Sequence, residues 1–199
     1  DNAITGYDYS WTLESMSNGG RLIKRYADNA VNTDILKIGS GANTVLDPGF
    51  NEPHGLTVDP NTNAIFVADT DNHRIVKITQ TASFSYTYTA FGSAGSGLGE
   101  FNQPYGVAVD SQGNIWVSER GNDRIQKFAA DFTPLGWFTG APGHAFGDSW
   151  DIAVSDIGEV YVATGNEIQK YHEAAPPVPA PLAVLGGGVV GWFGLMRRR

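Results

Sequence analysis

The 199-residue sequence contains no cysteine, which excludes disulfide bonds, thiolate nucleophiles and cysteine-ligated zinc. Helical periodicity is also missing, because no stretch between residues 1 and 172 keeps apolar residues at i, i+3, i+4 and i+7 over three turns. Basic residues are few: 13 Lys and Arg stand against 21 Asp and Glu, and the terminal Arg197, Arg198 and Arg199 are among the 13. A chain this acidic repels phosphate backbones, so no nucleic-acid partner is expected.

Glycine is abundant, with 25 residues, and hydrophobic and aromatic residues make up 41% and 12% of the chain. Short runs rich in Val, Ile and aromatic residues alternate with clusters of Asn, Asp and Gly. Such runs are typical of short β-strands joined by tight turns. The sequence therefore predicts an all-β fold.

Three segments repeat along the chain, starting at Phe50, Phe101 and Phe146, which are 51 and 45 residues apart. Each is followed by a second and a third apolar run, and two of them by a fourth. Four short strands that recur with a period near fifty predict the blades of a β-propeller. The second runs are Ala64–Asp69, Ile115–Glu119 and Val160–Thr164; the third are Arg74–Ile78, Arg124–Phe128 and Glu167–Tyr171, with an early copy at Arg21–Tyr26; the fourth are Tyr86–Phe91 and Leu135–Phe138.

Two of these units closely resemble the NHL repeat. The residues that carry the resemblance are Pro53–Asp59, Ile65–Asp69 and Asp71–Ile75 in one unit, and Pro104–Asp110, Ile115–Glu119 and Gly121–Ile125 in the next. Residues 146–172 look like a degenerate third copy without the Pro-x-Gly and the arginine. The resemblance implies an NHL-type β-propeller, incomplete here, with about three to four four-stranded blades. Streptogramin lyases and lactonase-like propellers carry similar repeats.

The repeats divide the chain into segments. An open arc of blades exposes sheet edges and faces, so we expect further blades before Asp1; the alternative is a complete small propeller. The first residue is not Met, which fits either a removed leader or a sequence that begins inside a longer protein. The expected segments are a partial blade at 1–49, NHL blades at 50–100 and 101–145, a degenerate blade lacking its outer strand at 146–172, a proline-rich linker at 173–181, and a hydrophobic sorting or membrane segment with an arginine tail at 182–199.

The C-terminal tail has a different composition from the blades. Residues 182–196 carry no charge and precede the three arginines. As a helix this run would be roughly 22 Å long, short of a hydrocarbon core of about 30 Å. It could cross a bilayer marginally, with the arginines on the cytoplasmic side and the propeller outside. The alternative is a buried core helix.

The tail resembles the PEP-CTERM class of bacterial sorting signals, which combine a short proline motif, a hydrophobic helix and a basic end. Val178-Pro179-Ala180-Pro181 matches the V-P-x-P frame, with Ala180 where the commonest form has Glu. The resemblance implies export, a transient or retained association with the inner membrane, and processing near this motif by an exosortase-type enzyme. It implies surface or matrix sorting.

Residues at the start of each repeat are candidates for a binding face. The residue between Pro and Gly reads His54, then Tyr105, then Trp150, with Asp151 in the glycine position of the third copy. Related peptide-amidating lyases hold zinc there with histidines from several blades, and one histidine cannot build such a site. We therefore expect no metal and no cofactor. A position that varies while its neighbours repeat is where a propeller sets specificity.

Recurring carboxylates raise a second possibility, a calcium site like that of lactonase-like propellers. The candidates are Glu52, Asp59, Asp69, Asp110, Glu119 and Asp151. The competing explanation is that these carboxylates cap turns or pair with Arg74 and Arg124. The leading hypothesis is a non-enzymatic binding module for an unknown protein or glycan. The rival is an exported lyase or lactonase-like enzyme whose active site lies partly in blades before Asp1.

Overall fold

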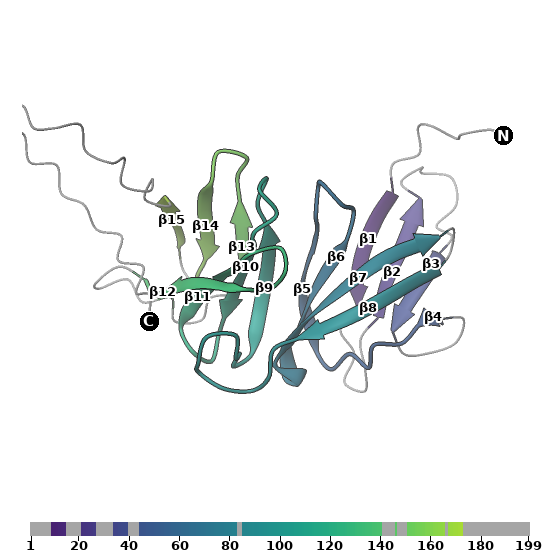
Figure 1. The fold of residues 1–199 in the computed structure, drawn as a ribbon, viewed down its shortest axis with the longest axis horizontal. Helices are drawn as coiled ribbons and strands as arrows, with labels where there is room; N and C mark the ends of the chain where they lie inside the picture. The colour runs from purple at the N-terminus through teal and green to yellow at the C-terminus, as the bar shows by residue number, and fades with distance from the viewer. Residues whose placement is uncertain are drawn as a thin grey trace, which may run out of the picture.

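The computed structural model describes residues 9–14, 21–26, 34–39, 44–82, 85–140, 146, 151–165 and 167–172. These residues form fifteen strands in four sheets, which confirms the predicted all-β fold (Figure 1). Within each sheet the strands follow one another in chain order, as in a meander. Each sheet is therefore a local unit of the chain, as a propeller blade requires.

We refer to the four sheets as blades 1 to 4. Blade 4 has three strands among the described residues, and the other blades have four. Blade 1 comprises β1 (Tyr9–Glu14), β2 (Arg21–Tyr26), β3 (Asp34–Gly39) and β4 (Thr44–Leu46); blade 2 comprises β5 (Pro53–Val58), β6 (Ile65–Asp69), β7 (Arg74–Ala82) and β8 (Ser85–Phe91); blade 3 comprises β9 (Pro104–Val109), β10 (Ile115–Glu119), β11 (Arg124–Phe128) and β12 (Pro134–Phe138); blade 4 comprises β13 (Asp151–Val154), β14 (Glu159–Ala163) and β15 (Ile168–His172).

The pairing register relates blade 1 to the others. In blades 1, 2 and 3 an acidic residue pairs with the arginine that begins the next strand: Glu14 with Arg21, Asp69 with Arg74, and Glu119 with Arg124. Strands β1, β2 and β3 therefore correspond to the second, third and fourth strands of a blade. β4 is an addition that the sequence did not predict, a three-residue strand parallel to β3.

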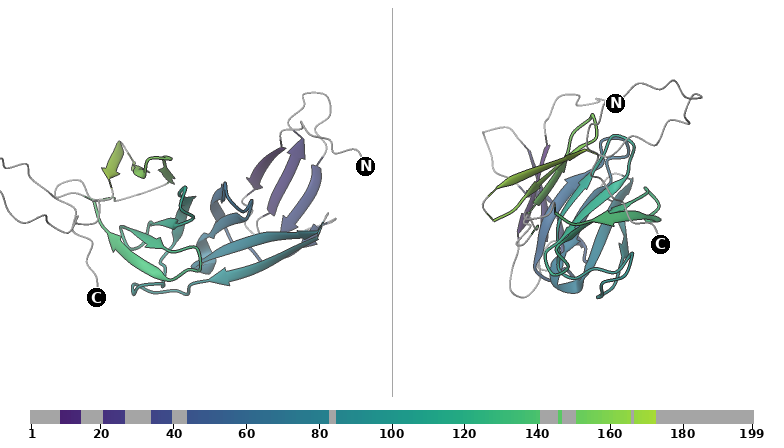
Figure 2. Two further views of the ribbon diagram at one scale, coloured as in Figure 1. Left: turned by 45° about the horizontal axis from the view of Figure 1, so that its top comes forward. Right: turned by 90° about the vertical axis from the view of Figure 1, so that its left-hand side faces the viewer.

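The blades stand side by side in an arc, with β5, β9 and β13 as neighbouring inner strands (Figure 2). Consecutive blades pack face to face, so strands such as β6 and β10 are buried along their whole length. This explains why their sequences are almost continuously apolar. The three core clusters include Ile38, Val67 and Ile78 between blades 1 and 2; Phe66, Ile75, Val107 and Val117 between blades 2 and 3; and Trp116, Ile125, Ile152 and Val162 between blades 3 and 4.

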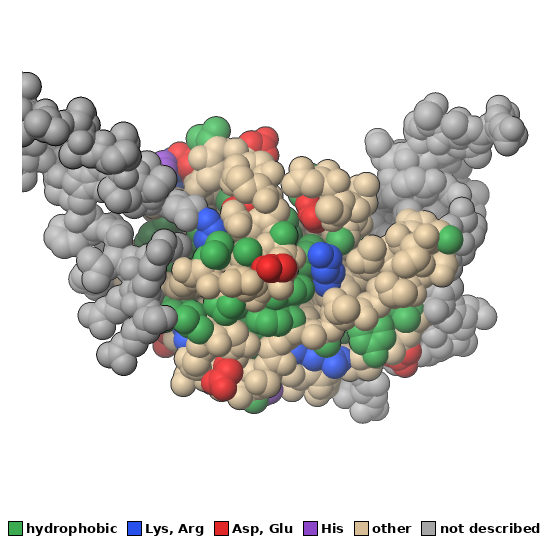
Figure 3. All heavy atoms as spheres, in the orientation of Figure 1, with side chains coloured by type: hydrophobic (Ala, Val, Ile, Leu, Met, Phe, Trp, Pro, Cys, Tyr) green, Lys and Arg blue, Asp and Glu red, His purple; other side chains and the backbone are tan. Residues whose placement is uncertain are grey.

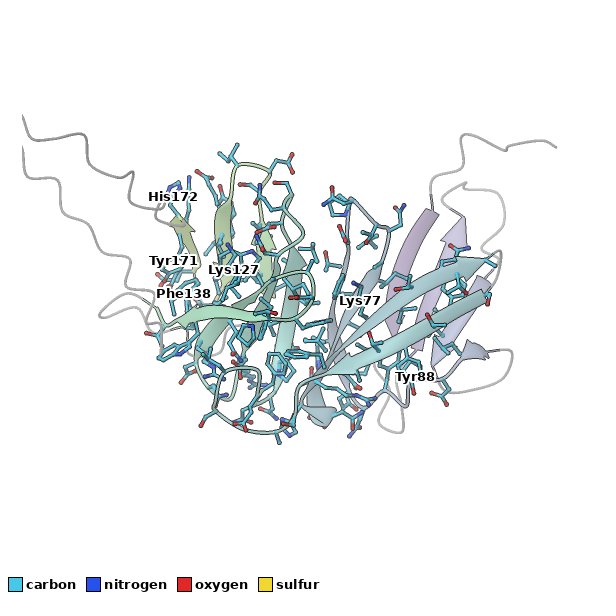
Figure 4. The ribbon with its side chains drawn as sticks, viewed as in Figure 1. Lys77, Tyr88, Lys127, Phe138, Tyr171 and His172 are labelled. Atoms are coloured by element: carbon cyan, nitrogen blue, oxygen red, sulfur yellow. The ribbon has the colours of Figure 1, made fainter. Side chains whose placement is uncertain are left out.

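Aromatic rings extend the core toward the outer strands. Phe138 of β12 and Tyr171 of β15 lie with ring centroids 5.1 Å apart, side by side at the boundary of blades 3 and 4 (Figure 4). On the outer surface the exposed large hydrophobic residues include Tyr88 on β8 and Leu135 on β12. Figure 3 shows hydrophobic side chains gathered across this side of the molecule, between scattered charges.

Several predicted features lie outside the described residues. These are Trp150, the linker, the sorting motif Val178–Pro181, the hydrophobic helix and Arg197–Arg199. In the part of the chain that is described, no helix has the length and apolar character needed to span a membrane.

Candidate functional site

The inner strands bring two of the predicted face residues into contact. His54 near the start of β5 and Tyr105 near the start of β9 stack with ring centroids 4.1 Å apart and an interplanar angle of 29°. His54 is exposed and Tyr105 is half-buried. Asp151, the first residue of β13, is exposed on the next inner strand. These residues, together with Arg120, are called the inner-strand cluster below.

Two glycines permit this close approach of the inner strands. A Cβ built on Gly55 would lie under 3.0 Å from the carbonyl oxygen of Tyr105 and from the Cα of Gly106. A Cβ on Gly106 would lie 2.9 Å from the amide nitrogen of Ile152 and 3.0 Å from the Cα of Asp151. Because the neighbouring atoms are backbone atoms, only glycine fits, and the Pro-x-Gly motif thereby sets the spacing of the blades.

The imidazole of His54 is held by Glu52 and by Thr70, and Thr70 is itself bonded to blade 3. Nδ1 lies 2.8 Å from the Glu52 carbonyl oxygen, which can only accept, so Nδ1 carries the proton and donates. The Thr70 hydroxyl donates to the Pro104 carbonyl at 2.7 Å and lies 3.1 Å from the same Nδ1. In the neutral ring Nε2 therefore carries the lone pair.

The phenol of Tyr105 lies among charges from blades 3 and 4. Burial raises its pKa above the ordinary value, the Arg120 cation lowers it and the Asp151 carboxylate raises it. With the pKa raised, the phenol stays protonated at neutral pH and can donate a hydrogen bond. The cluster thus offers an aromatic stack, a hydroxyl, a carboxylate and a guanidinium. Arg120 was not singled out from the sequence; its place after the acidic end of β10 was the available signal.

The recurring acidic residues at the ends of β6 and β10 are buried and form ion pairs with the arginines of the next strands. Asp69 Oδ2 lies 2.7 Å from Arg74 Nε, and Glu119 Oε1 lies 2.5 Å from Arg124 Nε. Asp69 also accepts from the amide of Asn51, and Glu119 accepts from that of Asn102 at 3.0 Å. The pairing with Arg74 and Arg124 agrees with the structural explanation given from the sequence. The carboxylates also tie the loop before each inner strand to its own blade.

Asp59 and Asp110 have a second structural role, in the hairpins after the inner strands. Asp59 accepts from the Asn61 amide and from the Thr62 hydroxyl. Asp110 accepts from the Asn114 amide and, at 3.1 Å, from the indole nitrogen of Trp116. Both are turn-forming contacts of the kind that Asp commonly makes.

Among the described residues, no group of three or more His, Asp or Glu side chains is arranged so that it could hold a metal ion. His73 lies in the turn between β6 and β7, and its Nδ1 accepts from the Gln103 amide at 3.1 Å. It therefore connects blade 2 to blade 3. His144 and Trp150 lie outside the described residues.

Sequence reasoning also missed a cross-strand pairing of aromatic residues with lysines. The lysine nitrogen lies 5.4 Å from the Phe66 ring centroid for Lys77, 4.5 Å from that of Trp116 for Lys127, and 5.7 Å from that of Tyr161 for Lys170. Trp11 and Lys24 share the same register in blade 1. The labelled Lys77 and Lys127 lie on the third strands of their blades (Figure 4). A lysine recurs in every third apolar run, and this recurrence could have predicted the pairing from the sequence. The physical basis of the pairing is cation–π attraction.

Known proteins with NHL repeats are similar to this chain in sequence. A model of the NHL repeat matches residues 50–78 and 101–128. NHL repeat-containing protein 3 of Homo sapiens is 31% identical over 185 residues, which cover 88% of this chain and 51% of that protein. The chain thus spans about half the length of the curated relatives that it matches.

Solved structures with a similar fold include enzymes and binding proteins. Virginiamycin B lyase from Staphylococcus aureus superposes with a TM-score of 0.53 at 18% identity, covering 86% of this chain and 53% of that chain. A chain of the nidogen/laminin complex superposes with a TM-score of 0.57 at 11% identity, covering 83% and 59%. At these identities the likeness concerns the fold alone. The sequence carries NHL repeats, and its described sheets have the fold of an NHL-repeat β-propeller.

Proposed function

We propose that this chain is an exported, surface-sorted NHL-repeat propeller that acts as a non-enzymatic binding module of a bacterial envelope or extracellular matrix. The main support for this proposal is the inner-strand cluster. There, three neighbouring blades present side chains of different chemical types at matching or adjacent positions of their inner strands. His54 stacks on Tyr105 at 4.1 Å, and Asp151 lies near enough to influence the Tyr105 phenol. By contrast, the recurring carboxylates at Asp69 and Glu119 are committed to ion pairs within their blades.

The chemistry of this cluster fits a protein or glycan ligand with both a flat apolar surface and polar edges. An aromatic stack offers contact area at low entropy cost, and the phenol, carboxylate and guanidinium add directional hydrogen bonds. The nidogen/laminin structure illustrates that a chain with this fold can occur in a protein–protein complex. No nucleic-acid ligand is proposed, since the sequence carries 21 acidic against 13 basic residues.

Replacing Tyr105 by alanine should lower affinity for a cognate ligand at least roughly tenfold, because a half-buried aromatic anchor is lost. The chain would be applied to an array of bacterial polysaccharides and matrix proteins, and each hit titrated by biolayer interferometry. Tyr88→Ala is the matched control, because Tyr88 is 40% exposed on the outer strand β8. Equal loss in both variants, or loss in neither, would count against the inner-strand cluster as the binding site.

The enzymatic alternative is supported by one observation, the hydrogen bond that fixes the neutral tautomer of His54. Its Nδ1 donates to the Glu52 carbonyl, which leaves Nε2 as a potential base or metal ligand. The fold likeness to virginiamycin B lyase is compatible with such a role. Elemental analysis of the purified protein separates the two proposals: a stoichiometric metal lost in His54→Ala supports an enzyme, and its absence together with a binding hit supports the module.

We propose that the tail is a sorting signal processed near Val178–Pro181. In a host with an exosortase-type enzyme, the mature protein should lack the segment after this motif, including Arg197–Arg199. Intact-mass spectrometry of the exported protein measures this directly. Changing Pro179 and Pro181 together to alanine should leave the tail attached. Identical masses for the two proteins would contradict the assignment.

A further inference from the structure

We infer that the outer strand of blade 2, β8, is a self-association edge that pairs antiparallel with β8 of a second copy of this chain. β8 is the last strand of its sheet, and among the described strands it pairs with β7 alone. Figure 2 shows it along the outside of the arc. Apart from the ladder with β7, no described backbone group hydrogen-bonds to the backbone of residues 86–91. The outward N–H and C=O groups of β8 can therefore accept another strand.

The free edge of β8 lacks the features that usually prevent edge-to-edge pairing. Proteins protect an edge strand with charged residues, proline, a bulge or a short length. β8 has seven residues, and none of them is charged, proline or glycine. Its residues 86–91 pair with β7 without a register shift, and residues 78–99 carry no charge at all. Five of the seven residues are exposed, including Tyr88 at 40% (Figure 4).

The outer strands of the neighbouring blades do have protective features. β12 of blade 3 has five residues and begins with Pro134, which has no N–H to donate. A register shift opposite Lys127 and Phe128 places a bulge in β12 at Leu135. β4, the outermost strand of blade 1, has only three residues. Of these three outer strands, β8 alone is left unprotected, so edge pairing is expected at blade 2.

This edge stays accessible in a larger ring of blades. Blade 2 lies between blades 1 and 3, and its two faces pack on them through separate core clusters. A further blade would pack face to face on blade 1 or blade 4, at an end of the arc. β8 lies instead on the circumference, where an additional blade leaves it uncovered.

Charge and symmetry favour a second copy of the chain as the occupant. The formal net charge is -8, so two copies repel each other least where the contacting strands carry no charge. A two-fold axis at Tyr88 sets this residue opposite Tyr88 of the second copy, and Thr87 opposite Thr89 of the second copy. Aromatic pairs and threonine pairs of this kind stabilise antiparallel sheets. The contact is isologous and joins the two sheets into one continuous sheet.

Sedimentation velocity of the full chain over a dilution series tests the inference. The wild type should show a reversible monomer–dimer equilibrium. Tyr88→Lys should raise the dimer dissociation constant at least roughly tenfold, because it sets two lysines directly opposite each other. This change makes the chain less negative, so an effect of net charge alone would strengthen the dimer instead. Leu135→Lys is the matched control, because Leu135 is 39% exposed on the protected strand β12, and its dimer should be at least as stable as that of the wild type.

A mixture of two variants tests the two-fold arrangement. Tyr88→Glu alone should also weaken the dimer, whereas Tyr88→Lys mixed with Tyr88→Glu should form a heterodimer, because opposite charges then face each other across the axis. Tyr88→Ala keeps the main-chain hydrogen bonds and should change the dissociation constant no more than about fivefold. In the wild type, amide hydrogen exchange of β8 should slow as the protein concentration rises, and that of β12 should not. Circular dichroism verifies that the variants fold.

Several results would overturn the inference. One is a wild type that stays monomeric at every concentration. Another is a dimer that persists in Tyr88→Lys, which would mean that the tail or another surface associates. Failure of the mixed variants to associate, or amide exchange of β8 that does not depend on concentration, would equally exclude pairing through this edge.

Discussion

Replacing Glu119 by alanine should lower the free energy of unfolding by about 3–5 kcal/mol, the usual cost of breaking a buried ion pair from one side. The Glu119 side chain is 0% exposed and that of Arg124 is 6% exposed, so the guanidinium would be left in the interior without its carboxylate. The side-chain amides of Asn122 and Gln126, which donate to Glu119 at 2.6 Å and 2.8 Å, would each lose one of two acceptors, the others being the carbonyls of Gly95 and Glu100. Urea unfolding followed by tryptophan fluorescence measures the loss.

Two further variants test whether the unpaired buried charge of Arg124 causes the loss of stability in Glu119→Ala. Asp69→Ala should be less damaging than Glu119→Ala, because the Arg74 side chain is 24% exposed and can be hydrated after its partner is removed. Adding Arg124→Met to Glu119→Ala should recover part of the stability by removing the orphaned charge. Equal losses for Asp69→Ala and Glu119→Ala, with no recovery in the double variant, would mean that side-chain packing rather than charge dominates.

Replacing Gly55 by alanine should lower the free energy of unfolding by about 1–3 kcal/mol, the usual range for overpacking. The added Cβ would meet the Tyr105 carbonyl and the Cα of Gly106, and neither backbone atom can rotate away. The inner strands of blades 2 and 3 would have to separate, which loosens the His54–Tyr105 stack as well. Thermal unfolding of the variant measures the cost.

Gly165→Ala is the matched control for this prediction. Nothing lies within 4 Å of a Cβ built on Gly165, so alanine should be tolerated with a change of about 0.5 kcal/mol or less. If Gly55→Ala were as stable as this control, the spacing of the inner strands would have to adjust more easily than the backbone contacts indicate. The proposed reason for the Pro-x-Gly motif would then be wrong.

The structure assigns most of the recurring residues to the blades and few to a site. Asp59, Asp69, Asp110 and Glu119 are all engaged in turns or ion pairs. The binding site that we propose lies instead at positions where the repeats differ, such as His54 and Tyr105. The residues that stabilise a blade recur because each blade packs against its neighbours in the same way. Residues that contact a ligand can differ from blade to blade, because several blades contact it at once.

The fold was predictable from local patterns. The apolar runs and the turn clusters predicted the strands, and the early copy of the third run, Arg21–Tyr26, coincides with β2. The pairing of Glu119 with Arg124 was also foreseen, because the acid and the arginine recur together in two repeats. These features depend on contacts within one blade, between residues close in sequence.

The contacts between blades were decided only by the tertiary structure. The stack of His54 on Tyr105 joins residues of different blades, and the role of Gly55 depends on where the next inner strand lies. The exposure of Ile168, against the burial of Ile75 and Ile125, likewise depends on which sheet covers which. The sequence by itself determined the strands, their order and the repeat, because these arise from local periodicity and hydrogen bonding. The packing of whole sheets determined the rest, because burial and contact between blades belong to the arrangement and not to any one segment.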